Sequence, residues 1–173
     1  MENITNLNKQ FLYEQFPLLR TDTLFSLKKK PSIAYNCIAL TLGIYNFCVW
    51  PTYSGIVTNP NNNQRVFWPK ELPLDDSLEN FIKMYNMFDY VECDNDLYYE
   101  DGYTKIAIYA INNVVTHAAL QLTENKWASK IGYSFGITHQ LKSLEGEKYG
   151  KVVKFMKRDD NISFTKYSKY FQQ

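Results

Sequence analysis

Residues 105–131 constrain the fold more than any other part of the chain. They hold three apolar segments, 105–111, 114–122 and 126–131, which are rich in the β-branched and aromatic residues that strands favour. Short polar turns at Asn112-Asn113 and Glu124-Asn125 separate the segments. Turns of two to three residues join antiparallel neighbours, because parallel strands need a longer crossover. The sequence therefore predicts an antiparallel meander.

Two helices are predicted ahead of this meander. One begins after Asn36, a good N-cap residue, and ends at Gly43, which suits the left-handed position past a helix end. The other begins with a capping-box pattern, Asp76 with Glu79, and carries an apolar stripe at helical spacing as far as Phe88. Both helices can therefore pack an apolar face on the sheet.

The remaining segments are less regular. Residues 1–20 indicate a short helix or an arm that packs on the body, and residues 50–73, with two Trp-Pro pairs and an Asn-rich cluster, indicate a long loop. The acidic stretch 92–102 is typical of solvated turns. Residues 151–156 predict a fourth strand, and the tail 158–173 adds a strand or frays.

This order of elements predicts an α+β fold, with N-terminal helices packed on an antiparallel sheet of about four to five strands. The chain has 173 residues, which suits a single domain spanning 1–173. Aromatic residues make up 16% of it, enough to fill a core without disulfides or metals.

Charge and composition exclude several classes of function. Lys and Arg number 19 against 18 Asp and Glu, so nothing indicates a nucleic-acid partner, and the short basic run 28–30 is expected to be a solvated turn. No stretch has the length of a membrane span, and the polar N-terminus is unlike a signal peptide, so we expect a cytoplasmic protein. Three cysteines and two histidines without metal-site spacing predict no metal and no cofactor.

Cys37 is the best candidate for a catalytic nucleophile. It falls in the first turn of the predicted helix, where free backbone N–H groups and the helix dipole favour a thiolate and lower the pKa of a cysteine. The same N–H groups can hold an oxyanion. Cys48 and Cys93 lack such a position and are expected to be core or loop cysteines.

His117, near the start of the second strand, is the candidate general base. A third group is needed to orient its ring, and Ser129 on the following strand can lie beside it. The sequence leaves other orienting groups open: Gln121, Asn112, Asn113 and His139. His139 lies in a loop-like stretch, 136–139, and could also replace His117 as the base.

These residues are similar in kind and order to the catalytic residues of a known enzyme superfamily. A cysteine on a helix in YNCIALTLG, a histidine on a strand in VVTHAALQLTENKW and a polar residue on the next strand resemble the papain-like fold of NlpC-type peptidases and CHAP-type amidases. The resemblance covers roughly residues 35–43 and 104–132. It implies a papain-like fold with Cys37, His117 and Ser129 in the catalytic roles. Ser129 departs from the His, Asn or Gln that those enzymes favour.

The chain is also similar to a bacterial family of unknown function. The shared features are the Asn-Cys-Ile-Ala stretch from Asn36, the two Trp-Pro pairs, the Thr-His-Ala strand, the Ser-Lys-Ile-Gly stretch from Ser129 and a late Leu-Glu-Gly…Tyr-Gly element. This similarity supports the fold and implies no activity.

Together these points predict a cysteine hydrolase or acyltransferase that acts on an amide or peptide bond, as a protease, amidase or deamidase does. The resemblance would suit a toxin, an effector or a conflict protein. Asn36, Trp50 and Trp68 border the predicted site and are candidates for contacts with a protein or peptide substrate. The alternative is a non-catalytic interaction module on a papain-like scaffold.

Overall fold

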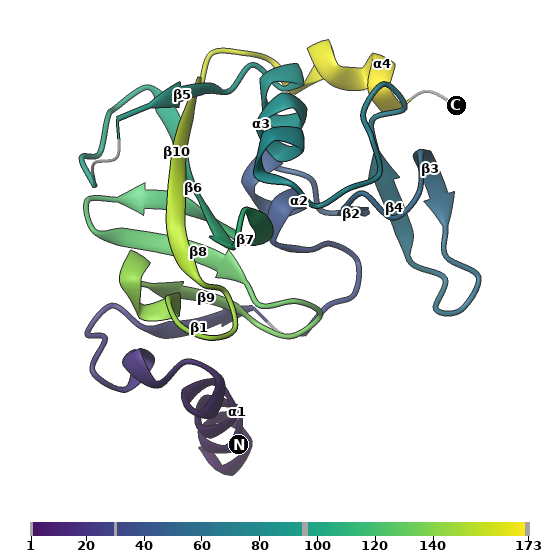
Figure 1. The fold of residues 1–173 in the computed structure, drawn as a ribbon. Coiled ribbons are helices and arrows are strands. Elements are labelled where there is room, and N and C mark those ends of the chain that lie inside the picture. Colours follow the sequence, from purple (N-terminus) through teal and green to yellow (C-terminus); the bar gives the residue numbers. More distant parts are fainter. Residues whose placement is uncertain (1, 30, 95–96, 172–173) are drawn as a thin grey trace.

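A computed structural model describes residues 2–29, 31–94 and 97–171, and its main feature is a seven-stranded antiparallel sheet (Figure 1). In spatial order the strands are β1 (Ser26–Lys29), β9 (Gly136–His139), β8 (Lys126–Lys130), β7 (Val114–Thr123), β6 (Tyr103–Ile111), β10 (Lys151–Asp159) and β5 (Val91–Cys93). Every neighbouring pair is antiparallel. The predicted meander is the β6–β7–β8 part of this sheet.

A second, three-stranded sheet has the order β2 (Cys48–Val49), β4 (Arg65–Trp68) and β3 (Gly55–Thr58). The β3–β4 pair is a hairpin, and β2 runs parallel to β4. Figure 1 shows this sheet to one side of the large sheet, beyond α2 (Cys37–Leu42) and α3 (Leu78–Met87).

The remaining elements are short helices, apart from the N-terminal one. They are α1 (Glu2–Gln15), η1 (Pro17–Arg20), η2 (Leu141–Leu144), η3 (Phe164–Tyr167) and α4 (Ser168–Phe171). Pro17 opens η1, since proline fits the first turn of a helix but cannot continue α1. Among the described residues, no helix has both the length and the apolar character needed to cross a bilayer.

The large sheet has an apolar core on each face. Alternate residues of β6 divide between them: Ile106 and Ile108 pack with α2 and α3, whereas Ala107 and Tyr109 pack with α1, η1 and η2. Each fully buried aliphatic or aromatic side chain contributes about 1.5–3 kcal/mol to folding. The two cores hold β6 and β7 in place from both sides.

The structure confirms an α+β architecture with a mostly antiparallel sheet and corrects the predicted size of that sheet. Seven strands replace four to five, because short segments with weak strand patterns pair at its edges. Three segments were assigned wrongly: 136–139, expected to be a loop, forms β9; 28–29, expected to be a turn, lies in β1; and part of 92–102 belongs to β5. Lys30 lies outside the described residues.

Three further predictions change in detail. Residues 50–73 are not one loop, since they contain the β3–β4 hairpin. The helix predicted to open at Asp76 is capped instead by Ser77, whose side chain accepts a hydrogen bond from Asn80 N. The tail forms η3 and α4 rather than a strand, after β10 has run three residues beyond its predicted end.

Candidate functional site

Asn36 sets the start of α2 and so the place of Cys37. Its Oδ1 accepts hydrogen bonds from the N–H of Ala39 at 3.0 Å and of Val49 at 3.1 Å, and its Nδ2 donates to the carbonyl of Val49 at 2.9 Å. These bonds cap the helix and tie it to β2. Gly43 ends the helix with φ 76°, as predicted. Cys37 is therefore the first helical residue, at the N-terminus of α2.

The Cys37 thiol is buried among backbone donors. Burial raises its pKa to about 11, against the opposing effects of backbone hydrogen bonds from Ala118, Ile38 and Cys37 itself and of the positive charge of Lys130. The expectation of a lowered pKa is therefore wrong, because the loss of hydration outweighs the helix N-terminus. At neutral pH the resting thiol is protonated. Its contact with Ala118 places it beside the residue that follows His117.

A β-bulge in β7 precedes His117. Tyr109 of β6 pairs with His117, and the next residue, Ala110, pairs with Val115, so that Thr116 is the extra residue. The Thr116 hydroxyl donates to the carbonyl of Tyr149 at 2.7 Å. This bond ties the bulge to the segment that covers the histidine.

The Tyr149 ring lies flat on the His117 ring, with centroids 4.2 Å apart and planes 2° from parallel. Gly150 allows this approach, because a Cβ at that position would stand 2.1 Å from the carbonyl oxygen of Ala110. The tyrosine thus restricts rotation of the imidazole and shields it from solvent.

A chain of hydrogen bonds crosses three neighbouring strands. His117 Nε2 on β7 lies 2.9 Å from Ser129 Oγ on β8, and Ser129 Oγ lies 2.8 Å from His139 Nε2 on β9. His139 Nδ1 lies 2.8 Å from the carbonyl oxygen of Gln140, whose own N–H donates to Asp22 Oδ2 at 2.7 Å. All three side chains of the chain are buried.

The chain of bonds has only one consistent direction when both histidines are neutral. A carbonyl can only accept, so His139 Nδ1 carries the proton and His139 Nε2 must accept from the Ser129 hydroxyl. Ser129 Oγ then accepts from His117 Nε2–H. The lone pair of His117 is left on Nδ1, a buried atom without a hydrogen-bond partner among the described residues. His117 is thereby set as a proton acceptor.

Both histidines are held neutral. Burial, with a smaller effect from His139, holds the pKa of His117 well below its usual value of 6.5. Burial also lowers the pKa of His139 to about 4, although the Gln140 carbonyl and Asp22 favour its charged form. Neither ring is charged at neutral pH, so the resting pair with Cys37 is a thiol and an imidazole rather than an ion pair.

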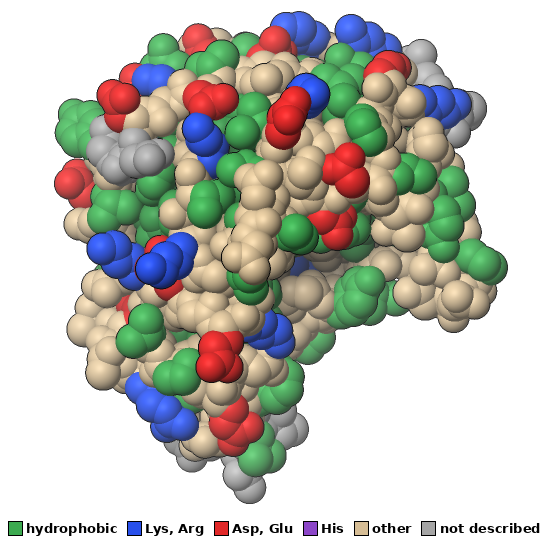
Figure 2. All heavy atoms as spheres, viewed as in Figure 1, with side chains coloured by type: hydrophobic (Ala, Val, Ile, Leu, Met, Phe, Trp, Pro, Cys, Tyr) green, Lys and Arg blue, Asp and Glu red, His purple; other side chains and the backbone are tan. Residues whose placement is uncertain are grey.

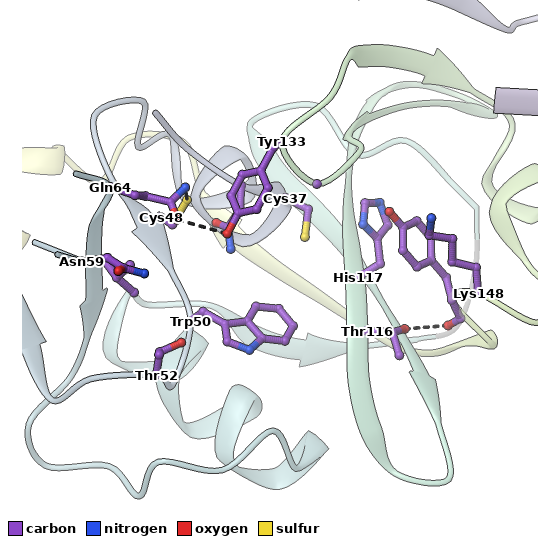
Figure 3. Close-up of a pocket in the computed structure, with 14 residues that line it drawn as sticks. Cys37, Cys48, Trp50, Thr52, Asn59, Gln64, Thr116, His117, Tyr133 and Lys148 are labelled. Carbon is purple, nitrogen blue, oxygen red and sulfur yellow. Dashed lines mark hydrogen bonds between the residues drawn. The ribbon is translucent and has the colours of Figure 1, made fainter. Parts of the chain in front are cut away.

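Cys37 and His117 line the same pocket, which has a volume of about 510 Å³. In Figure 3 the sulfur of Cys37 lies between α2 and the His117 ring, and the Trp50 ring lies below the sulfur in this view. The opposite wall carries neutral polar side chains from the three-stranded sheet and its loops: Thr52, Asn59 and Gln64. Tyr133 reaches over from the β8–β9 turn and donates to Gln64 Oε1 at 3.1 Å.

The structure brings together most of the predicted site residues. Ser129 lies within hydrogen-bonding distance of His117, as the sequence predicts, and His139, one of several alternatives, takes part beside Ser129 rather than in its place. Cys37 lines the same pocket as His117. Asn36 and Trp50 line the pocket. Trp68 does not: it is fully buried in the core and donates to the carbonyl of Pro73, which leaves no surface for a substrate.

The other candidate orienting groups lie away from His117. Gln121 bonds the carbonyl of Leu97 through its Nε2, and Asn112 with Asn113 forms the β6–β7 turn in left-handed conformations. Cys48 lines the pocket, where Gln64 Nε2 donates to its sulfur at 3.1 Å.

Sequence reasoning missed Lys130. Its ammonium is buried and donates to the carbonyls of Gly132 at 2.7 Å and Ser134 at 2.8 Å, and its charge favours the thiolate forms of Cys37 and Cys48. A lysine beside Ser129 in a strand is expected to point to solvent, so no sequence signal marked it. The late Tyr-Gly pair was noted as a motif, but not the stacking of Tyr149 on His117.

Comparison with known proteins identifies a family without an activity. A family model described as a domain of unknown function (DUF7689) matches residues 26–157, which include α2, the three strands of the hydrogen-bond chain and Tyr149. No curated protein and no solved structure matches the chain.

Proposed function

The chain belongs to the DUF7689 family, and because that family has no assigned function, we propose from the site itself that the protein is a cysteine hydrolase or acyltransferase acting on amide or peptide bonds. The supporting observation is the directional chain from the Gln140 carbonyl through His139 and Ser129 to His117. It leaves the Nδ1 lone pair of His117 without a partner among the described residues, and His117 lines the pocket that Cys37 also lines.

The proposed reaction begins with the neutral pair. As the Cys37 sulfur attacks the substrate carbonyl carbon, His117 Nδ1 takes the thiol proton. The negative charge on the carbonyl oxygen develops near the N-terminus of α2, where the backbone donors around the sulfur can stabilise it. The C–N bond then breaks, and His117 returns the proton to the leaving nitrogen.

The acyl group remains on the Cys37 sulfur as a thioester. In hydrolysis a water molecule attacks it, His117 accepts the water proton and passes it to the leaving sulfur, and a carboxylic acid is released. In transfer an amine attacks in the same way. Ser129 and His139 act as positioning residues, since they hold the ring and its tautomer and stabilise the imidazolium that forms.

The resting charge state distinguishes this site from one with a preformed thiolate. The raised pKa of Cys37 and the depressed pKa of His117 mean that proton transfer accompanies attack instead of preceding it. Such a thiol is inert until a carbonyl carbon is held next to it. The arrangement of a helix-borne cysteine and a strand-borne histidine is the feature that supports a papain-like assignment.

A peptide library digested with the native protein tests this proposal. We expect new peptide termini with wild type and none with Cys37→Ala or His117→Gln, while Cys93→Ala, at a half-buried cysteine outside the pocket, keeps full activity. Intact-mass analysis of a quenched reaction should find an acyl adduct on Cys37. Cleavage that survives Cys37→Ala, or a wild type that neither cleaves peptides nor forms an adduct, would reject the proposal.

One observation favours the alternative, a non-catalytic interaction module. Burial keeps both Cys37 and His117 uncharged, as it does for many structural residues in cores. In that case Cys37→Ala would leave every binding partner and every biological effect unchanged.

A further inference from the structure

The pocket that holds Cys37 adjoins a second one. A pocket of about 450 Å³ lies against α1, where Phe11 and Gln15 line it, and it shares four lining residues with the first pocket: Gly132, Tyr133, Lys148 and Tyr149. The two spaces therefore adjoin along Tyr133 and Lys148. Figure 2 shows the corresponding side of the molecule hollowed between the part that holds α1 and the part that holds β3 and β4.

The second pocket lies on the leaving-group side of the proposed reaction. It shares Tyr149, whose ring covers His117, but neither Cys37 nor its neighbour Asn36 lines it. In the proposed mechanism His117 gives its proton to the leaving nitrogen, so the part of the substrate that departs must extend past His117. The part that stays on the sulfur lies against Trp50, Asn59 and Gln64.

The two sides differ in charge. Lys148 is the one charged residue that lines either pocket in the part of the chain that the structure describes, and it lines both. Its Nζ bonds the side-chain oxygen of Gln15, a neutral amide, so this partner does not cancel the positive charge. A carboxylate on the departing part of a substrate can replace that amide as the partner of Lys148.

We propose that the substrate is an extended polypeptide that lies across both pockets, with an acidic residue or a terminal carboxylate on its leaving-group side held by Lys148. This inference rests on the proposed function and names its substrate class. The two adjoining pockets favour a chain over a small molecule, because a small amide would fill only the first pocket. Lys148 is a specificity-determining residue here and takes no part in the chemistry.

Matched peptides test the proposal with the whole 173-residue chain. A set that differs only in the residues after the cleavage site, as Glu, Gln or Lys, is offered to wild type, Lys148→Ala, Lys148→Glu and the control Lys142→Glu, which changes an exposed lysine that lines neither pocket. We expect wild type and Lys142→Glu to prefer Glu over Lys by about fivefold or more in kcat/KM. Lys148→Ala removes this preference and Lys148→Glu reverses it.

The outcomes separate the two proposals. In one outcome, all three peptides are cleaved only when Cys37 is present, and every Lys148 variant ranks the Glu, Gln and Lys peptides by kcat/KM as wild type does. This outcome overturns the assignment of Lys148 and leaves the proposed chemistry intact. Cleavage of a small aryl amide but of no peptide overturns the polypeptide substrate alone. If neither peptides nor the aryl amide react and Cys37 gains no adduct, the proposed function fails and this inference fails with it.

Discussion

Ser129 connects the two histidines: its hydroxyl accepts a hydrogen bond from His117 and donates one to His139. A serine would orient an imidazole weakly by itself, since its hydroxyl rotates freely. Here His139 fixes the hydroxyl direction, and the Gln140 carbonyl fixes the tautomer of His139. In the proposed mechanism Ser129, His139 and the Gln140 carbonyl together orient the His117 ring, a task that a single Asp or Asn has in a Cys–His–Asp or Cys–His–Asn triad.

We expect Ser129→Ala to lower kcat by about ten- to a hundredfold, because His117 loses the partner that sets its tautomer, and to destabilise the fold by about 1–3 kcal/mol, because both Nε2 atoms lose their hydrogen bond. Ser143→Ala, at another buried serine, is the control for volume. Long-range ¹H–¹⁵N spectra provide the direct check: His117 must carry its proton on Nε2 in wild type. A proton on Nδ1 would contradict the direction of the chain.

The raised pKa of Cys37 predicts slow alkylation of the native protein. With a pKa of about 11 in place of 9.0, the thiolate fraction at pH 7 falls by about a hundredfold. The rate at which iodoacetamide alkylates Cys37 is measured in a variant that carries Cys48→Ser and Cys93→Ser. In the native protein this rate should keep rising until about pH 11, whereas in the unfolded chain it should level off near pH 9. An apparent native pKa at or below 9 would show that the sulfur is better solvated than the structure has it.

At the scale of elements, Asn36 links α2 to the three-stranded sheet through three hydrogen bonds. Asn36→Ala removes all of them, and we expect a loss of about 2–3 kcal/mol in the free energy of unfolding, more than a helix cap alone contributes. Asn36→Asp keeps the acceptor and loses only the bond from Nδ2, so it should cost less. Urea unfolding of both variants measures the difference, and equal losses would mean that Oδ1 contributes little.

The β-bulge in β7 is a second feature, at the scale of elements, that positions the site. It inserts Thr116 ahead of His117 and so decides which face of β7 each later side chain occupies. His117 then faces Tyr109 and Tyr149 while Ala118 faces α2. The backbone N–H of Ala118 reaches the Cys37 sulfur from β7, so neighbouring residues of this strand carry the imidazole of His117 and contact Cys37.

At the scale of the whole molecule, the two neutral histidines make the fold sensitive to acid. In the unfolded chain a histidine binds a proton below about pH 6.5, whereas the folded chain binds it at His139 only near pH 4 and at His117 well below 6.5. The unfolded state therefore holds more protons, and stability falls as pH drops from 6.5 toward 4. His139 alone accounts for up to about 3 kcal/mol of that loss.

Thermal or urea unfolding between pH 7 and 4 measures this loss. His139→Gln should show a shallower decline with pH than wild type, whatever its stability at pH 7, because one of the two protonation differences is gone. Identical slopes would mean that His139 is not held neutral in the fold. Carboxylates titrate in the same range in both proteins, and the difference between the two curves removes their contribution.

Local patterns in the sequence were sufficient for the elements whose formation depends on neighbouring residues. Asn36 and Gly43 bounded α2 correctly, because capping and left-handed backbone are local preferences. The turns at Asn112 and Asn125 likewise set the β6–β7–β8 meander, and the meander alone put His117 and Ser129 on adjacent strands. The short edge strands were missed, since pairing with a distant partner, and not their own composition, makes them strands.

Only the tertiary structure decided the protonation states of the site residues and which further groups contact His117 and Ser129. The helix N-terminus predicts a lowered thiol pKa, but burial of the thiol in the core raises it by more, and burial is a property of the whole fold. The role of His139 depends on β9 pairing with β8, and that of Tyr149 on Gly150 meeting β6. Distant contacts of this kind leave no periodic trace in a sequence, because they join residues whose spacing along the chain is arbitrary.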